Sequence, residues 1–144
     1  MRTIIQRVKK AKVEVEGKIV GQITEGFMIL VGFTFTDSEN NIKEMVKKII
    51  NLRIMDDDNG VMNKSILDTG GSILSISQFT LYADTKKGNR PSYINALPGD
   101  KAIKLYDLFN EELSKYVHVE KGIFGAEMQV SLINDGPITI TLER

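Results

Sequence analysis

The chain has 144 residues, enough for one domain with a substantial hydrophobic core, and it contains no cysteine. Disulfide bonds, thiolate metal sites and a cysteine nucleophile are therefore excluded. Because 19 basic and 19 acidic residues cancel, a polyanionic partner would have to be held by a local patch rather than by net charge.

The opening residues are interrupted by charge too early for an export signal, and the longest apolar stretch, residues 27–35, is about half as long as a membrane helix. No segment repeats with a period that would indicate a solenoid. We therefore expect one soluble, cytoplasmic domain over residues 1–144 that has no membrane partner.

The first third of the chain has the pattern of β-structure. Apolar and polar residues alternate over residues 3–8 and 11–15, which predicts half-buried strands. Residues 16–18 predict a turn and residues 19–23 a returning strand. The dense apolar run at residues 27–31 is typical of a strand that is buried on both faces.

A helix is predicted at about residues 38–52, where apolar residues recur at helical intervals. Thr36 and Glu39 have the spacing of a capping box. After it, residues 57–60 (Asp-Asp-Asn-Gly) predict a hairpin turn. They are not a calcium loop, because aligning Gly60 with the glycine of such a loop puts Met55 at the first ligand position.

The second half of the chain adds strands and one further helix. Residues 72–81 predict a strand, and Pro98 opens a helix that ends near Tyr116. Its apolar stripe is core-forming: Ala102, Leu105, Tyr106, Phe109 and Leu113. Two final strands, 127–133 and 138–142, are predicted on either side of a turn at 134–137. The sequence thus predicts an α+β domain with a mostly antiparallel, curved or barrel-like sheet and two helices.

The sequence offers few residues for conventional catalysis. The single histidine, His118, has no acidic or hydroxyl partner at a recognisable spacing, so we expect a structural role. We predict no metal and no cofactor, since one histidine without cysteine does not make a usual zinc site, and no nucleophile elbow, phosphate loop or dinucleotide fingerprint is present.

Two hydroxyl-bearing segments remain, at residues 77–82 and 134–139. By themselves, both have ordinary structural explanations, because Ser and Thr are common on strands and Gly-Pro is common in turns. However, a strand end that presents a Thr hydroxyl, a Gln amide and free backbone N–H groups can bind a carbonyl or its developing oxyanion.

Together, the S-Q-x-T element at 77–80 and the N-x-G-P-x-T element at 134–139 closely resemble the marks of the D-aminoacyl-tRNA deacylase family. Both elements are intact. The resemblance covers nearly the whole chain, in six further ordered blocks at residues 1–2, 6–8, 51–54, 62–63, 87–92 and 124–128.

The resemblance implies a homodimer that hydrolyses the ester of D-aminoacyl-tRNA, and of mischarged glycyl-tRNA, at active sites in the subunit interface. A cis Gly136-Pro137 turn of one subunit would enter the pocket of the other, fixed by hydrogen bonds from Arg7 to its backbone, and its carbonyls would exclude an L side chain. The implied catalytic residues are Ser77, Gln78, Phe79 and Thr80. The implied substrate-binding residues are Gly136, Pro137, Arg7, Asn134, Phe124, Ala126 and Met128.

Several alternatives stay open. Thr80 would be either a nucleophile or a group that positions the ester while the terminal ribose hydroxyl of tRNA helps to activate water. The basic residues of the opening segment and of residues 86–90 would also suit a non-catalytic RNA-binding module. A small-molecule esterase or amidase that acts without RNA is the third alternative, although it would lack the usual nucleophile elbow and triad.

Overall fold

The first strand organises the sheet of this protein, which is described here as a computed structural model of residues 1–144. β1 (Arg2–Val15) pairs antiparallel with β3 (Gly26–Gly32) through its first half and with β2 (Lys18–Ile23) through its second half. Along almost its whole length it also pairs antiparallel with β8 (Gln129–Glu143). The first and last strands therefore lie side by side.

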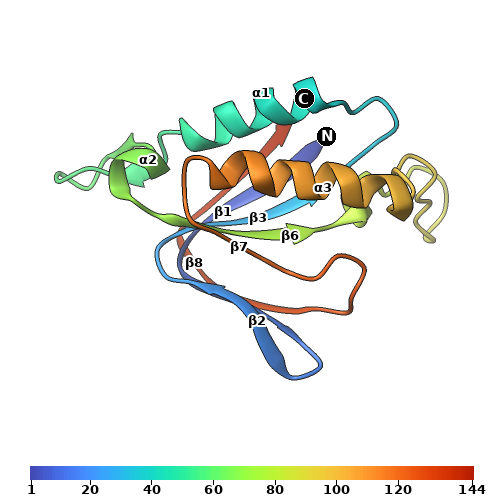
Figure 1. Cartoon of the computed structure of the whole chain (residues 1–144), viewed down its shortest axis with the longest axis horizontal. Coiled ribbons are helices and arrows are strands. Elements are labelled where there is room, and N and C mark those ends of the chain that lie inside the picture. The colour runs from blue at the N-terminus through green and yellow to red at the C-terminus, as the bar shows by residue number, and fades with distance from the viewer.

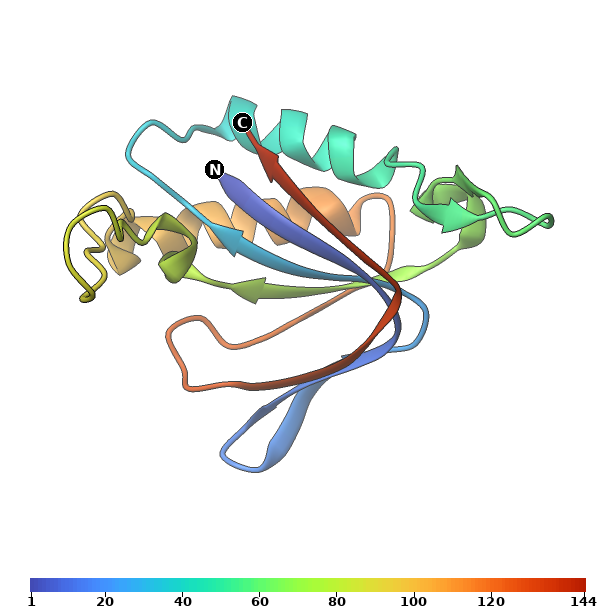
Figure 2. The ribbon, with the colours of Figure 1, turned by 180° about the vertical axis from the view of Figure 1, so that it is seen from behind.

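Two parallel strands extend this antiparallel part. β6 (Ser72–Ser77) pairs with β3, and β7 (Val119–Lys121) pairs with β6, which gives the order β2-β1-β3-β6-β7 with β8 on β1. The sheet curves until it is nearly closed, with β2 and the first half of β8 folded away from the helices (Figure 1, Figure 2). The predicted fold class, an α+β domain with a mostly antiparallel, barrel-like sheet, is confirmed.

α1 (Glu39–Ile50) and α3 (Gly99–Ser114) lie next to each other over one face of the sheet (Figure 1). Both were predicted, and both bury one apolar stripe. The main core fills the space between these helices and the sheet, where the side chains of Ile49, Phe27 and Phe109 are fully buried. A smaller cluster, which includes Val13 and Leu74, lies inside the curled half of the sheet.

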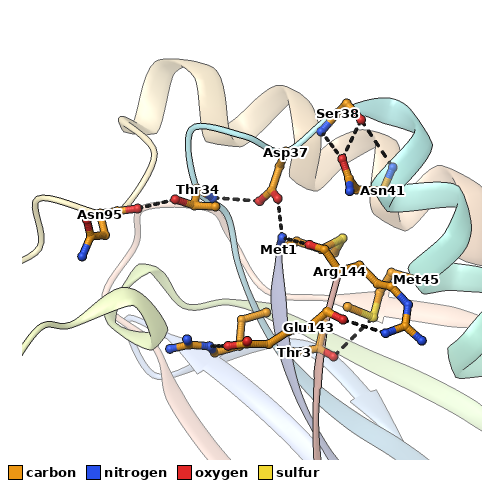
Figure 3. Close-up of polar contacts among 11 residues, drawn as sticks. Met1, Thr3, Thr34, Asp37, Ser38, Asn41, Met45, Asn95, Glu143 and Arg144 are labelled. Carbon is orange, nitrogen blue, oxygen red and sulfur yellow. Dashed lines mark hydrogen bonds and ion pairs between the residues drawn. The ribbon is translucent and has the colours of Figure 1, made fainter.

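The cap of α1 differs from the prediction. Ser38, not Thr36, is the N-cap: its side chain accepts a hydrogen bond from the Asn41 N–H, and the Asn41 side chain accepts one from the Ser38 N–H (Figure 3). The helix starts at Glu39 because Asp37 is already engaged in a preceding turn, where its carboxylate accepts from the Thr34 N–H at 2.8 Å.

Short elements that the sequence pattern did not predict complete the fold. β4 (Met55–Asp56) and β5 (Met62–Lys64) form a small separate hairpin, which confirms the predicted turn at residues 57–60. α2 (Ile66–Thr69) is a single helical turn. The predicted strand over 72–81 is too long: β6 ends at Ser77, and residues 79–82 form a 3-10 turn, η1 (Phe79–Tyr82).

The prediction of two separate C-terminal strands is wrong: they form the single strand β8, and the turn predicted between them at 134–137 is a bulge within it. Gln6 faces Thr139 and Val8 faces Asn134, so the four residues 135–138 of β8 bulge out opposite Arg7 alone. The ladder resumes after this bulge because the Asn134 side chain closes it, donating to the Thr139 hydroxyl at 3.0 Å and accepting from the Ile138 N–H at 3.3 Å. Likewise, residues 3–8 and 11–15 form the single strand β1.

Where β1 begins and β8 ends, a polar network ties the sheet to the connections around it (Figure 3). The Met1 ammonium group is paired with the buried Asp37 carboxylate and donates to the Arg144 carbonyl at 2.6 Å. The Thr34 hydroxyl donates to the Asn95 carbonyl at 2.7 Å, which anchors the segment before α3 to the same turn. None of the helices is long and apolar enough to cross a membrane.

Candidate functional site

A cavity of about 610 Å³ lies where β6 ends. Its wall is mostly apolar and comes from the ends of β3 and β6, the segment before α3 with the first turns of that helix, and the β7–β8 connection with the start of β8. It brings together six of the predicted site residues: Ser77, Gln78, Phe79, Phe124, Ala126 and Met128. These come from segments almost 50 residues apart in the sequence, joined by the sheet topology.

The chemistry available in this cavity is limited by what lines it. Its wall contains hydroxyl, amide and aromatic side chains, but no carboxylate, histidine, lysine or arginine. This chain therefore supplies no strong base to the wall of the cavity. A reaction here would depend on hydrogen bonds and on groups that a substrate carries.

Local backbone interactions place Gln78 and Phe79 at the cavity. The Gln78 N–H donates to the Val31 carbonyl at 2.7 Å, after which the chain leaves the sheet and turns into η1. This turn packs against Gly32, where an added Cβ would lie 2.7 Å from the Gln78 carbonyl oxygen. As the first N–H groups of a helix, those of Phe79 and Thr80 have no acceptor within η1.

Thr80 lies beside the cavity rather than in its wall. The half-buried Thr80 hydroxyl accepts a hydrogen bond of 2.5 Å from the Gln78 side-chain amide. An amide N–H donates a proton and does not remove one, so this contact orients the hydroxyl without activating it as a nucleophile.

Arg2, which the sequence reasoning did not single out as a site residue, holds the far end of η1. Its guanidinium donates to the Leu81 carbonyl, lies 5.0 Å from the ring centre of Tyr82, and pairs with Glu143 on β8. Burial raises the pKa of Tyr82 to about 12, and the nearby Asp37 carboxylate acts in the same direction. The first and last strands of the chain, β1 and β8, thus support the turn that carries Thr80.

The remaining predicted residues, Asn134, Gly136, Pro137 and Arg7, form a second group that does not line the cavity of its own chain. The Gly136-Pro137 peptide bond is cis, and Gly136 has a φ of +116°. A Cβ at Gly136 would lie 2.8 Å from the Ile138 Cγ1 atom, so both the backbone and the available space require glycine.

Arg7 is buried under this bulge, but it does not contact the Gly-Pro backbone through the hydrogen bonds that we expected. Its Nη1 atom donates to the Ile54 carbonyl at 2.9 Å and to the Asp56 carboxylate at 2.8 Å. Its Nε atom lies 3.2 Å from the carboxylate of Asp135, the residue before Gly136, in an ion pair without hydrogen-bond alignment. Sequence reasoning missed both aspartates because neither has a recognisable spacing from Arg7.

The single histidine takes no part in either group. His118 is exposed just before β7, and its Nε2 atom lies 3.0 Å from the Glu120 carboxylate. The expectation that it lacks an acidic partner is therefore wrong, because residues two apart on an extended chain share a face. The structure contains no cluster of three or more His, Cys, Asp or Glu side chains that could hold a metal ion.

Comparison with known proteins assigns this geometry to a family. A family model described as D-Tyr-tRNA(Tyr) deacylase matches residues 4–143. A solved structure titled "c-Myc DNA Unwinding Element Binding Protein" is 40% identical, with a TM-score of 0.95 over 100% of this chain and 99% of that chain. A second, titled "Structural Analysis of a probable eukaryotic D-amino acid tRNA deacylase", shares the fold at 18% identity, with a TM-score of 0.84 over 98% and 97% of the two chains.

Proposed function

Because the chain belongs to the D-Tyr-tRNA(Tyr) deacylase family, whose members hydrolyse the ester bond of aminoacyl-tRNA, we propose that it removes a broad range of D-amino acids, and glycine, from tRNA. The observation that carries this proposal is the cavity, which joins the S-Q-x-T strand end to the β7–β8 connection. Its volume of about 610 Å³ is within the usual range for a site that encloses a small ligand, here an aminoacylated adenosine.

In the proposed reaction, the ester carbonyl lies against the N–H groups at the start of η1, which stabilise the negative charge that develops on its oxygen. The Thr80 hydroxyl donates a hydrogen bond to the substrate and keeps its proton, since its oxygen already accepts from Gln78. Water attacks the carbonyl carbon while the free ribose hydroxyl of the terminal adenosine helps to take up its proton. The ester C–O bond then breaks, and the proton passes to the leaving ribose oxygen, which gives the free amino acid and the deacylated tRNA. Two features favour this route over a Thr80 nucleophile: the amide contact to Thr80 and the absence of a base from the cavity wall.

For chiral selection, we propose that the Gly136-Pro137 bulge of one subunit reaches the cavity of a second subunit in a homodimer. The backbone carbonyls there would occupy the space that an L side chain needs, whereas a D residue or glycine directs only hydrogen toward them. Exclusion by backbone needs no specific contact with the accepted side chain, which accounts for a broad range of substrates.

Two features support a partner for this bulge. None of its residues lines the cavity of its own chain, and β8 pairs only with β1, so its other edge is open over a 15-residue strand. Ile133, next to the bulge on that strand, is about half exposed. Open edges and exposed apolar residues are common where subunits meet. We expect the dimer to act on tRNA in the cytoplasm.

The activity is tested by incubating the purified protein with matched D-aminoacyl-, L-aminoacyl- and glycyl-tRNA. We expect hydrolysis of the D and glycyl esters and protection of the L ester. Equal hydrolysis of D and L esters would contradict the exclusion mechanism. Hydrolysis of none of them would contradict the assignment of this chain as an active deacylase.

The cross-subunit site is tested by mixing two variants of strongly reduced activity, Thr80→Val in the cavity region and Gly136→Ala in the bulge. In a mixed dimer, one site then combines an intact cavity with an intact bulge, so random exchange restores about one quarter of the wild-type activity. If bulge and cavity act within one chain, mixing restores nothing. Sedimentation at micromolar concentration checks that the protein is dimeric.

A further inference from the structure

An exposed loop stands next to the cavity and is closed at its base. The Asp84 N–H donates to the Ser92 carbonyl at 2.7 Å, and the Ser92 N–H donates to the Asp84 carbonyl at 2.9 Å. Residues 85–91 between them are all exposed. In Figure 1 and Figure 2 this loop, drawn in yellow, projects from the end of the molecule at which η1 and the start of α3 lie. We call residues 84–93 the rim loop.

The base of the rim loop is fixed to the cavity wall. Tyr93 lines the cavity and packs edge-on against Phe79, with 5.0 Å between the ring centres. Two residues further, the Asn95 carbonyl accepts from the Thr34 hydroxyl (Figure 3), and the Leu97 N–H donates to the Phe33 carbonyl at 2.9 Å. The loop is therefore held at a defined position relative to the proposed reaction site, while its tip is free.

The tip of the rim loop carries positive charge that no ion pair within the chain neutralises. The one acidic residue of the loop is Asp84 at its base, whose carboxylate accepts from the Lys86 backbone N–H at 2.9 Å. Lys86, Lys87 and Arg90 are exposed, and none of them forms an ion pair. By contrast, the lysines at positions 9, 12 and 64 are each paired with a carboxylate. The two other connections at the cavity rim, residues 96–99 and 124–128, contain no basic residue and one acidic residue, Glu127. Positive charge is thus concentrated on one side of the cavity.

Aromatic surface lies between this charge and the cavity. The Phe79 side chain is 56% exposed and that of Tyr93 is 42% exposed, although the two rings contact each other. Sites that bind single-stranded nucleic acid combine water-exposed aromatic rings with unpaired cations. The bases stack on the rings, and the cations contact the phosphates.

We propose that the rim loop binds the single-stranded 3′ end of tRNA, with Tyr93 stacking on a nucleotide that precedes the terminal adenosine and with Lys86, Lys87 and Arg90 contacting the phosphates. This inference rests on the proposed function, because it requires the aminoacylated adenosine to occupy the cavity. Binding by the rim loop explains how a protein with no net charge holds a polyanion. The electrostatic attraction is local and acts on the RNA strand that enters the cavity.

The test compares two triple variants that remove the same charge. One replaces Lys86, Lys87 and Arg90 by alanine. The matched control replaces Lys43, Lys47 and Lys48, three exposed lysines of α1 that also form no ion pair. Each variant is assayed on D-aminoacyl-tRNA and on D-aminoacyl-adenosine, which has the ester but none of the preceding nucleotides.

We expect the rim-loop variant to lower kcat/KM on D-aminoacyl-tRNA at least about tenfold more than on D-aminoacyl-adenosine, mainly through KM. The slope of log(kcat/KM) against log[salt] should become less negative by about 2, since three contacts to single-stranded phosphates are lost. The control should behave like the wild type on both substrates. Rim-loop and control variants with the same KM for tRNA would overturn the inference.

Tyr93 is tested separately with Tyr93→Ala and Tyr93→Phe. Loss of a stacked base should raise KM for D-aminoacyl-tRNA by about 5- to 150-fold in the alanine variant, and phenylalanine should restore it. An equal loss on D-aminoacyl-adenosine would overturn the stacking role, because that substrate lacks the nucleotide. A wild-type protein that hydrolyses neither ester would instead count against the proposed function, so the two failures are distinguishable.

Discussion

The side-chain amide of Gln78 donates a hydrogen bond of 2.5 Å to the hydroxyl of Thr80, two residues along the chain. The hydroxyl oxygen is thereby occupied as an acceptor, and its proton remains available to a substrate oxygen. A hydroxyl that positions a substrate in this way contributes less to the rate than a covalent nucleophile does.

We therefore expect Thr80→Ser to retain most activity and Thr80→Ala to lower kcat/KM by about 10- to 100-fold without unfolding the protein. Gln78→Ala should reproduce part of this loss, because it releases the hydroxyl. Single-turnover hydrolysis measures the activity of each variant, and circular dichroism checks that each variant remains folded. A loss well above about 100-fold for Thr80→Ala, or trapping of an acyl-enzyme, would indicate covalent catalysis instead.

Gly136→Ala should abolish most deacylation and also lower stability. The positive φ of +116° is unfavourable for any residue with a Cβ, and that atom would lie 2.8 Å from Ile138. Such strain costs on the order of 1–3 kcal/mol. Gly60→Ala is the control for backbone strain alone, since Gly60 has a φ of +73° and nothing within 4 Å of an added Cβ. If both variants deacylate equally well, the geometry at Gly136 is not required for activity.

Arg2→Lys should lower kcat clearly and the free energy of unfolding only slightly. Lysine keeps the charge opposite Glu143, but it lacks the planar group that lies over Tyr82 while donating to Leu81. Glu143→Gln is the matched control, because it removes only an exposed ion pair worth about 0–1 kcal/mol. Steady-state kinetics and urea unfolding of both variants separate the two roles. Equal kcat values for Arg2→Lys and wild type would show that η1 keeps its position without this support.

The raised pKa of Tyr82 predicts a loss of stability at high pH. The unfolded tyrosine ionises near pH 10, whereas burial raises the pKa of the folded residue to about 12. The stabilisation is complete below about pH 10 and decreases as pH rises toward 12, because the unfolded state loses its proton first. Urea unfolding at pH 8 and pH 11 should show a smaller decrease for Tyr82→Phe than for wild type. Identical decreases would show that Tyr82 does not contribute.

Treatment with EDTA should leave the hydrolysis of D-aminoacyl-tRNA at its original rate. The chain has one histidine, no cysteine and no cluster of metal-binding side chains. Activity is compared before and after dialysis against the chelator. Inactivation that one particular metal reverses would require a metal site formed in another way, for example between subunits.

Local patterns in the sequence were sufficient to predict the long elements. α1 and α3 each repeat apolar residues at helical spacing over several turns, so their positions follow from adjacent residues alone. The continuity of β8 across residues 134–137 was not predicted, because a Gly-Pro pair favours a turn unless another strand and the Asn134 side chain hold the ladder on both sides. The parallel pairing of β6 with β3 and of β7 with β6 also depends on the whole sheet.

The candidate site, too, was predicted where local residues suffice and missed where its contacts depend on the whole fold. The segments around Ser77 and Phe124 were identified by their residues, but only the folded sheet shows that they line one cavity. The partners of Arg7 and the contact between Tyr93 and Phe79 join segments that are distant in sequence, and no spacing indicates them. Polar and aromatic contacts of this kind are set by tertiary structure, so a single sequence contains little signal for them.

The pairing of β1 with β8 affects how the protein folds as it is synthesised. Arg2 faces Glu143, so the first strand obtains one of its neighbours only after nearly the whole chain has left the ribosome. Until then one edge of β1, with its apolar side chains, is open to wrong pairing. Contacts between residues so far apart in the sequence also slow folding, since a large loop must close before they form. The helices α1 and α3 are complete before β8 is synthesised, so the curved sheet closes last.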